Sequence, residues 1–226
     1  MARHRESERE AVQSETRRLL LLAAAVEFAG EGYVGANINR ISKAAGFAKG
    51  TIYNYFPSKR ELMLALIEES AAAHFDFIRG QVLEKEAPDN RLARFFEAGF
   101  NWVSHNLAQG KAMVNTLYGP DEQFKLSMYK AYLPMFQFVS TGIIGPGVAQ
   151  GVFRDVDPEA TAALLMNIYL GTASQVNEDG RTWLPWRQVA EFALHALQKS
   201  EGIQTPDTHK EKPADTLDSS SFWKVW

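Results

Sequence analysis

Hydrophobic residues recur every three or four positions along most of the chain, and no segment shows a sustained alternation of apolar and polar residues. The first spacing predicts amphipathic helices, whereas the second would predict strands. We therefore expect an all-α fold, divided into helices by glycine, proline and N-cap residues. The expected helices lie at about residues 15–29, 38–45, 48–56, 58–80, 90–107, 111–117, 121–139 and 157–176, and from 185 onward.

Two of these helices are short and stand on either side of Gly46, and Asn37 is a suitable N-cap for the first of them. A pair of short helices around a glycine turn is typical of a helix-turn-helix. The next helix opens with Ser58 and Glu61 in the S-x-x-E spacing of a capping box. Together with the helix at 15–29, these elements predict a three-helix unit at the start of the chain.

Charge is distributed unevenly, because residues 1–60 contain ten Lys and Arg against six Asp and Glu although the whole chain has a net charge of −3. No acidic residue lies between Glu31 and Glu61, a window that contains five basic residues. A charged run is often only a solvated surface. A basic stretch on an acidic protein nevertheless indicates that one end holds a polyanion such as DNA.

Three motifs in the same region are more specific: Gly32-Tyr33, I-x-x-A-A-G at 41–46, and K-G-T-I-Y-N-Y-F at 49–56 followed by S-K-x-E-L. Together they make the segment Phe28 to Leu66 resemble the DNA-binding region of TetR-family repressors. The resemblance implies a ligand-responsive transcription regulator, a repressor that leaves a palindromic double-stranded DNA operator when a small-molecule effector binds. The resemblance covers about the first seventy residues. For the remainder of the chain it therefore predicts the arrangement of the helices but not the ligand that they bind.

That architecture is an N-terminal helix-turn-helix DNA-binding domain, joined by a long helix to a larger helical domain for ligand binding and dimerisation. We expect the tail to be mobile, because its Pro, Thr, Asp, Lys and Ser residues cannot form a core. The expected boundaries are 1–60 for the DNA-binding domain, 61–82 for the connecting helix, 83–200 for the larger domain and 201–226 for the tail.

The residues expected at DNA come from the two short helices and their flanks. Gly50 has no Cβ and lets the backbone approach a phosphate closely. The resemblance implies that Lys49, Tyr53 and Asn54 face the groove and that Tyr55 and Lys59 contact phosphates. Arg40 opposes the dipole of its helix unless a phosphate relieves it. The expected DNA-binding residues are Asn39, Arg40, Lys49, Gly50, Thr51, Tyr53, Asn54, Tyr55 and Lys59.

Aromatic residues are dense between positions 95 and 138, where some must form the core and others could line an apolar pocket with a few polar anchors. No paired Arg or Lys cluster stands out there, which favours a neutral or apolar effector. The expected ligand-binding residues are Phe96, Phe100, Asn101, His105, Tyr118, Tyr132 and Phe136.

The helix at 160–176 is apolar nearly all round, so it must be covered on both sides. A second copy of the chain is one cover, and the family resemblance implies a four-helix interface made by the last two helices of each subunit. An internal core helix is the alternative. The expected interface residues are Leu164, Ile168, Gly171, Gln175, Trp186, Val189, Ala193 and Leu197.

Other classes of protein find little support. The chain has no cysteine and no HExxH, and Gly145-Pro146-Gly147 lacks the third glycine of a dinucleotide-binding loop. We expect no enzymatic activity, catalytic residue, metal or cofactor. The apolar run at 19–26 is too short to span a bilayer, so we expect a cytoplasmic protein without a membrane partner. The remaining alternative is a helical protein-interaction module whose helix-turn-helix no longer binds DNA, which acidic residues in the groove-facing helix would favour; none is present.

Overall fold

The computed structural model describes residues 2–173, 175–177 and 181–199, with side chains from residue 6 onward. Its ordered elements are helices, and the isolated bridge between Val176 and Thr182 is the only strand-like pairing in this part of the chain. The prediction of an all-α fold is therefore confirmed. The elements are α1 (Ala2–Gly35), α2 (Ile38–Ala44), the 3-10 turn η1 (Thr51–Asn54), α3 (Lys59–Gln81), α4 (Pro88–His105), α5 (Leu107–Leu117), α6 (Glu122–Val139), the π-helical turn η2 (Ser140–Ile144), α7 (Gly145–Ala149), α8 (Pro158–Ala173) and α9 (Trp186–Leu197).

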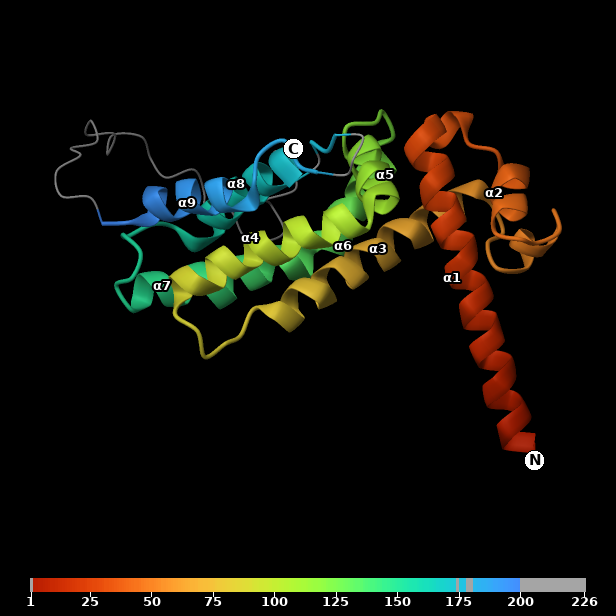
Figure 1. Cartoon of the computed structure of the whole chain (residues 1–226), viewed down its shortest axis with the longest axis horizontal. Coiled ribbons are helices and arrows are strands. Elements are labelled where there is room, and N and C mark those ends of the chain that lie inside the picture. Colours follow the sequence, from red (N-terminus) through yellow and green to blue (C-terminus); the bar gives the residue numbers. More distant parts are fainter. Residues whose placement is uncertain (1, 174, 178–180, 200–226) are drawn as a thin grey trace.

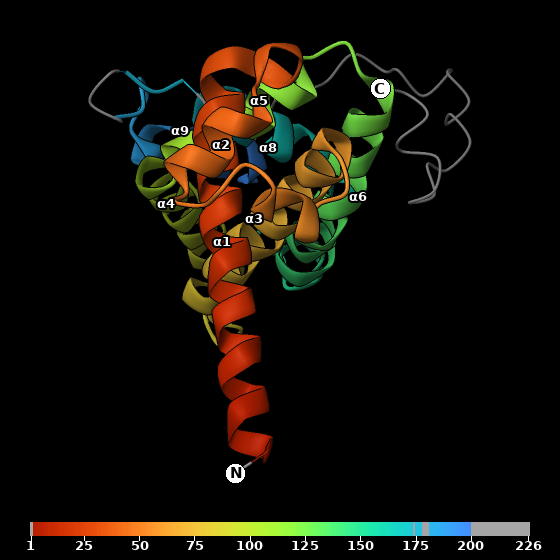
Figure 2. The same ribbon diagram turned by 90° about the vertical axis from the view of Figure 1, so that its right-hand side faces the viewer.

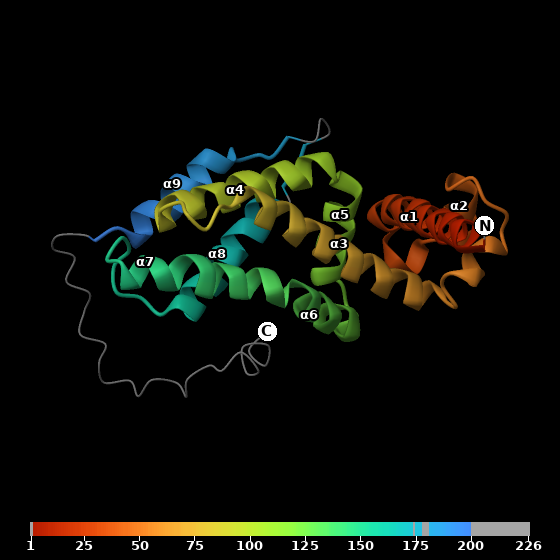
Figure 3. The same cartoon turned by 90° about the horizontal axis from the view of Figure 1, so that it is seen from below.

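The molecule has two parts, which α3 connects (Figure 1). The first part consists of α1, α2 and η1, and α1 projects away from the rest of the molecule at its N-terminal end (Figure 2). The second part is an elongated bundle of α4 to α9, along which α3 runs when the molecule is seen from below (Figure 3). Within the described residues, no helix is long and apolar enough to cross a membrane.

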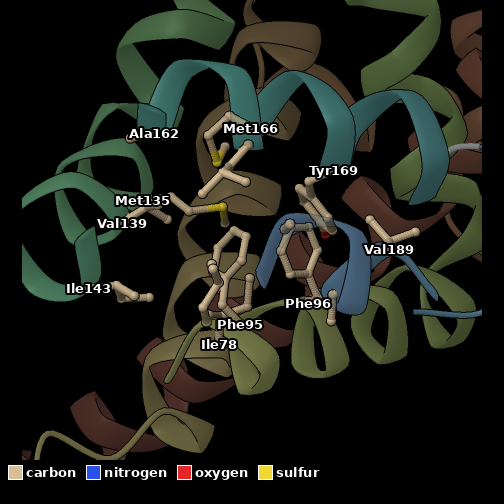
Figure 4. Packing of buried hydrophobic residues seen from close by; sticks show 14 of the residues in the cluster. Ile78, Phe95, Phe96, Met135, Val139, Ile143, Ala162, Met166, Tyr169 and Val189 are labelled. Carbon is tan, nitrogen blue, oxygen red and sulfur yellow. The ribbon is translucent and has the colours of Figure 1, made fainter. Parts of the chain in front are cut away.

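Each part has its own hydrophobic core. The larger core lies among α4, α6, α8 and α9, and Figure 4 shows Tyr169 of α8 beside Phe95 and Phe96 of α4. The smaller core is built around α1, η1 and the start of α3, but it also contains Met113 of α5 and Phe124 of α6. Part of α5 and the first half of α6 thus belong to the core of the first part, although they lie far from it in the sequence.

Four predicted helix starts are confirmed by the hydrogen bonds of their caps. The side chain of Asn37 accepts from the backbone N–H of Asn39, and that of Ser58 accepts from Glu61. Asp121 accepts from the first turn of α6, and Asp157 accepts from the backbone N–H of Ala160. These side chains satisfy backbone donors that have no partner inside the helix.

Several helix boundaries were predicted incorrectly. The segment expected as a helix at 48–56 contains only η1, since Lys49 and Gly50 lie in the turn before it. Helix α1 extends well beyond 15–29, and Gly32 kinks it with a φ of 66°. Gly110, which stands between the helices expected at 90–107 and 111–117, lies inside α5. Asp89, just before the first of these helices, lies in the first turn of α4 and does not cap it.

The later boundaries differ in the same way. The gap expected after residue 139 is helical at Gly142, Gly145 and Gly147, because η2 and α7 continue the helical path of α6, whereas Gly151 lies in the turn after α7 with a φ of 69°. Helix α8 ends at Ala173 rather than at 176. The expected tail at 201–226 lies outside the described residues.

Candidate DNA interface and ligand cavity

The candidate DNA surface is formed by α2, the turn after it and η1. The chain leaves α2 through Gly46, whose φ of 81° requires glycine, and enters η1 at Thr51. Ile52 and Phe56 point inward and are nearly fully buried, so they fix η1 to the core of α1 and α3. The opposite side of this segment therefore faces outward.

Most of the sequence-predicted DNA residues lie on that outward side. Asn39, Arg40, Lys49, Gly50, Tyr53 and Asn54 are exposed, whereas Thr51, Tyr55 and Lys59 are half-buried. Tyr53 exposes 50% of its surface, so its ring and hydroxyl are accessible to a partner molecule. The structure thus brings the predicted residues together on one surface, next to the start of α3.

The three candidate cations on this surface differ in how they are compensated. Arg40 pairs with Glu27 at 2.8 Å and with Glu31 at 3.6 Å, and the hydrogen bond to Glu27 is the main reason that the pKa of Arg40 is raised. The positive charge of Arg40 lies near the N-terminal end of α2, where the helix dipole disfavours it. The carboxylates of Glu27 and Glu31 on α1, rather than a phosphate, offset this unfavourable interaction. Lys49 forms no ion pair with any residue that the structure describes.

Lys59 has a structural role that the sequence did not suggest. Its Nζ donates hydrogen bonds to the carbonyl oxygens of Val34 and Ala36, each at 3.1 Å, and it lies 4.9 Å from the ring centroid of Tyr33. Carbonyls at the end of a helix lack intrahelical donors, so Lys59 stabilises the end of α1. At most one of its three N–H groups remains for a phosphate.

Arg60, the next residue, ties α3 to α6. Its guanidinium donates to the carboxylate of Asp121 at 3.2 Å and to the side chain of Gln123, and it stacks over the ring of Phe124 at 4.5 Å. The ring of Phe124 in turn meets that of Tyr33 edge-on, with centroids 4.7 Å apart. We call Tyr33, Lys59, Arg60, Asp121 and Phe124 the joint, because they connect the end of α1, the first turn of α3 and the start of α6.

A cavity of about 250 Å³, which we call the outer cavity, lies among α5, α6 and α8. Its wall is largely apolar, and its polar groups come mainly from tyrosines, Lys125 and Asn167. Lys125 is already paired with Glu122 at 2.8 Å. The lining residues are Leu117, Tyr118, Lys125, Tyr129, Tyr132, Phe136, Ala163, Met166, Asn167 and Leu170.

A smaller inner cavity of about 30 Å³ adjoins the outer one, and Leu117, Tyr132 and Leu170 line both. His74 of α3 lines the inner cavity and lies flat against Trp102, with ring centroids 4.1 Å apart. Burial disfavours the charged imidazole and lowers the pKa of His74 to about 3. His74 is therefore neutral at physiological pH.

Both ring nitrogens of His74 face tyrosine hydroxyls. Nε2 lies 2.7 Å from the hydroxyl of Tyr169, and Nδ1 lies 3.4 Å from that of Tyr132. Burial also raises the pKa of each tyrosine. Tyr169 can occupy its position because Gly99 has no side chain, since a Cβ there would come within 2.8 Å of the hydroxyl. These contacts form a neutral hydrogen-bonded chain from α6 through α3 to α8.

The sequence-predicted ligand residues are divided by the structure. Tyr118, Tyr132 and Phe136 line the outer cavity, whereas Phe96 and Phe100 are buried in the core of α4. Asn101 is exposed away from this cavity, and Nδ1 of His105 donates a local hydrogen bond to the carbonyl oxygen of Asn101. The helical spacing did not reveal the α8 residues of the wall or Lys125 and Tyr129, because aromatic density alone drew attention to α4.

The predicted interface residues on α8 and α9 also separate into two groups. Val189, Ala193 and Leu197 are almost fully buried against the chain's own core, so they have no surface left for a partner, and their assignment to an interface is corrected. Leu164 and Gln175 are exposed, while Ile168, Gly171 and Trp186 are half-buried. Phe192 of α9 is 65% exposed and was not predicted.

Comparison with known proteins agrees with this geometry. The model of the family described as "Bacterial regulatory proteins, tetR family" matches residues 20–66. The HTH-type transcriptional repressor KstR2 of Mycolicibacterium smegmatis is 32% identical over 155 residues, which cover 61% of this chain and 69% of that protein. The chain belongs to the tetR family. It is a DNA-binding transcription regulator with a helix-turn-helix, as the motifs at 32–62 indicated.

Two further comparisons extend over most of the length of the protein that is matched. The "Fatty acid metabolism regulator protein" of Bacillus subtilis is 26% identical over 192 residues, covering 83% of this chain and 93% of that one. The crystal structure of the regulator FadR from Bacillus subtilis in complex with stearoyl-CoA superposes with a TM-score of 0.70. It is 18% identical and covers 80% of this chain and 99% of that chain, so the fold is shared. Such relatives are transcription regulators and not enzymes.

Proposed function

We propose that this tetR-family regulator is a dimeric repressor that is released from a palindromic operator when an apolar small molecule fills the outer cavity. One observation supports the link between the two sites. Helix α6 contributes four residues to the cavity wall, and its first turn is held to α3 by Arg60, one residue from Lys59 and close to η1. A ligand that shifts α6 therefore acts on the DNA-binding part through the joint, provided that it favours one arrangement over the other.

For the DNA contacts, we propose that Tyr53 and Asn54 meet base edges and that Lys49 meets a phosphate. Asn39, Arg40, Gly50, Thr51 and Tyr55 would surround them. The support is their common outward surface and the freedom of Lys49 from ion pairs among the described residues. An asparagine amide can pair with adenine in the major groove, whereas a lysine supplies a point charge.

For the effector, we propose an acyl chain linked to coenzyme A. The Bacillus relatives are named for fatty acid metabolism and for a complex with stearoyl-CoA. The outer cavity has an apolar wall and a volume equal to about eight water molecules in the liquid. That size fits a short or medium acyl chain inside the protein, with the polar remainder outside. Tyr118, Tyr132 and Phe136 are the sequence-predicted residues that we retain for this site.

For the dimer, we propose that a second copy covers the exposed side of α8 and α9. Leu164 is 67% exposed on α8 and Phe192 is 65% exposed on α9, and large apolar side chains in adjacent helices indicate an interaction surface. Gly171 has open space where a Cβ would stand, which permits close approach of another helix. A regulator of this kind acts on chromosomal DNA, so we propose a cytoplasmic location.

Operator selection followed by ligand displacement tests the regulatory function. Random duplexes retained by the purified protein should converge on a palindrome with half-sites about 10 base pairs apart or a multiple of that spacing. Acyl-CoA thioesters of 4 to 18 carbons, as probes, should then lower operator affinity at about one chain length. Failure to enrich any sequence contradicts the DNA-binding proposal, and displacement by none of the thioesters contradicts the proposed effector.

The joint can be tested with a matched pair of variants in α3. Arg60→Met keeps the apolar stem over Phe124 but removes the bonds to Asp121 and Gln123. We expect operator affinity without ligand to change little, while the ligand's effect on that affinity falls. Arg79→Met removes an exposed pair with Asp76 elsewhere in the same helix and serves as control. Equal ligand responses in both variants would show that the joint does not transmit the signal.

Sedimentation equilibrium tests the dimer. Leu164→Arg combined with Phe192→Arg should dissociate it, because two charges would be buried without partners. Leu126→Arg, at an exposed leucine of α6, is the control and should leave the dimer intact. A wild-type chain that is monomeric at micromolar concentration contradicts the proposal, as does a dimer that survives the double substitution.

A further inference from the structure

Three hydrogen-bonded side chains, Tyr132, His74 and Tyr169, lie beside the inner cavity. Together they have more N–H and O–H donors than there are hydrogen bonds between them. Two close contacts join them, one at each ring nitrogen of His74. A neutral imidazole has one N–H and one acceptor nitrogen, and each phenol adds one O–H. Three protons are thus available for two hydrogen bonds, so one proton must point elsewhere.

The tautomer of His74 decides which tyrosine keeps this surplus proton. If Nε2 carries the hydrogen, Tyr132 donates to Nδ1 and the proton of Tyr169 has no acceptor among the described residues. If Nδ1 carries it, Tyr169 donates to Nε2, His74 donates to Tyr132, and the proton of Tyr132 is the surplus one. The neutral state of His74 excludes the third possibility, in which both nitrogens donate.

Burial favours the second arrangement. Tyr169 is 1% exposed and is surrounded by the rings of Phe95, Phe96 and Phe100, which provide no oxygen acceptor. A buried O–H without a partner is costly. The distances agree, because the contact of Tyr169 is the shorter by 0.7 Å, as expected for an O–H donor to a ring nitrogen.

Tyr132, in contrast, lines both cavities. There is therefore room beside its hydroxyl for an acceptor atom of a bound ligand. We infer that the hydroxyl of Tyr132 donates a hydrogen bond to the effector, and that the effector has a carbonyl oxygen beside the part of the outer cavity's wall that Tyr132 forms. This inference rests on the proposed function, since it specifies the chemistry of the same ligand.

A neutral carbonyl fits this position better than a carboxylate. A buried carboxylate needs a positively charged partner, and His74 remains neutral while Lys125 is engaged by Glu122. The carbonyl of a thioester, ester or ketone needs no counter-charge, and the one hydrogen-bond donor that Tyr132 supplies is sufficient for it. Apolar wall residues such as Phe136 and Met166 then surround the hydrocarbon part of the ligand.

The tautomer can be measured without any ligand. In protein labelled with nitrogen-15 at histidine, the His74 resonances are those missing from His74→Gln, and they should not titrate between pH 8 and pH 5. Their nitrogen shifts should identify Nδ1 as the protonated nitrogen. A proton on Nε2 would overturn the inference whatever the effector proves to be, and would leave the proposed repressor function untouched.

A matched pair of ligands tests the acceptor. Decanoyl-CoA has a thioester carbonyl, and S-decyl-CoA has the same chain as a thioether without it. We expect the wild type to bind the thioester about 2- to 10-fold more tightly, the range of one neutral hydrogen bond, and Tyr132→Phe to lose this preference. Ser127→Ala, which removes a hydroxyl from the same helix outside both cavities, should keep it.

The outcomes separate the two proposals. A preference for the thioester that persists in Tyr132→Phe, or no preference in the wild type, refutes the hydrogen bond while the acyl effector stands. If neither compound binds, coenzyme A conjugates are not the effector of the proposed function, and the tautomer measurement still decides where the surplus proton lies. Binding measured by calorimetry on the full chain distinguishes all three results.

Discussion

The candidate DNA surface and the cavities of the larger part use polar groups in opposite ways. At the DNA surface the polar side chains come from one short stretch, residues 39–59, and most of them are exposed. At the cavity they come from α3, α6 and α8, nearly a hundred residues apart, and His74 and Tyr169 are buried. The first site offers charge to a partner, whereas at the second His74, Tyr132 and Tyr169 form a neutral hydrogen-bonded chain. A motif of neighbouring residues can specify the first site, but only packing assembles the second.

The joint belongs to both regions. Phe124 lies on α6, which lines the cavity, yet its side chain is part of the core of α1 and α3. Arg60 and Lys59 are adjacent in the sequence, but one holds α6 and the other holds the end of α1. The two regions are therefore mechanically continuous although each has a separate core.

The largest expected effect is on stability, in Phe124→Ala, which removes the contacts that couple the two regions. Removing a fully buried phenylalanine costs about 3–5 kcal/mol of the free energy of unfolding, and here it also removes the ring that Arg60 and Tyr33 contact. The described tryptophans, Trp102, Trp183 and Trp186, all lie in the larger region. We expect tryptophan fluorescence and circular dichroism to report different urea midpoints in this variant.

Phe153→Ala is the control for that experiment, because Phe153 is equally buried but lies in the larger core, away from the joint. It should lower stability by a similar amount while the two signals stay coincident. Coincident transitions in Phe124→Ala would show that the regions are coupled by other contacts.

The next effect sharpens the functional contrast at the DNA surface. Asn54→Ala should reduce discrimination between operator and scrambled DNA by about 1–3 kcal/mol per half-site, because base-edge hydrogen bonds are lost. Nonspecific affinity and its dependence on salt should remain nearly unchanged. Titrations of both duplexes at several salt concentrations measure this. An equal loss on both would assign Asn54 to the phosphate backbone.

At the inner cavity, the buried His74 should make the free energy of unfolding depend on pH. The pKa of His74 is about 3 in the folded chain and about 6.5 when unfolded, so only the unfolded state binds a proton between these values. Stability is full above pH 6.5 and decreases as the pH falls. From pH 7 to pH 5 the contribution of His74 should amount to about 2 kcal/mol.

The difference between the wild type and His74→Gln in urea unfolding isolates this contribution from those of the other histidines. The two stability curves should converge as the pH is lowered from 7 to 5. Curves that remain parallel would mean that His74 is protonated in the folded state.

The smallest effect concerns the two lysines of the DNA surface. Lys49→Ala should flatten the salt dependence of DNA binding by roughly one unit per subunit, since a phosphate contact releases one counterion. Lys59→Ala should change that slope less but lower the melting temperature, because it removes the bonds to Val34 and Ala36. The reverse pattern would place the phosphate contact at Lys59.

Much of the fold could be predicted from local sequence signals. Caps at Asn37, Ser58, Asp121 and Asp157 gave correct helix starts, because a cap is a bond between neighbouring residues. Helix ends and glycines were predicted less well. Gly110 and Gly142 lie within helical elements since tertiary packing offsets their intrinsic cost, and Gly99 has a packing role that only the position of Tyr169 explains.

By itself, the sequence determined the helical class, the helix-turn-helix and an outward set of candidate DNA residues, because these depend on periodicity, caps and a contiguous motif. Only the tertiary structure decided which aromatic residues line a cavity and which form the core, since Phe96, Phe100 and Tyr132 have the same local character. It also decided that Lys59 and Arg60 form a joint and that Val189, Ala193 and Leu197 face inward. The physical reason is that burial and pairing are properties of elements brought together from distant parts of the chain, and no single segment contains that information.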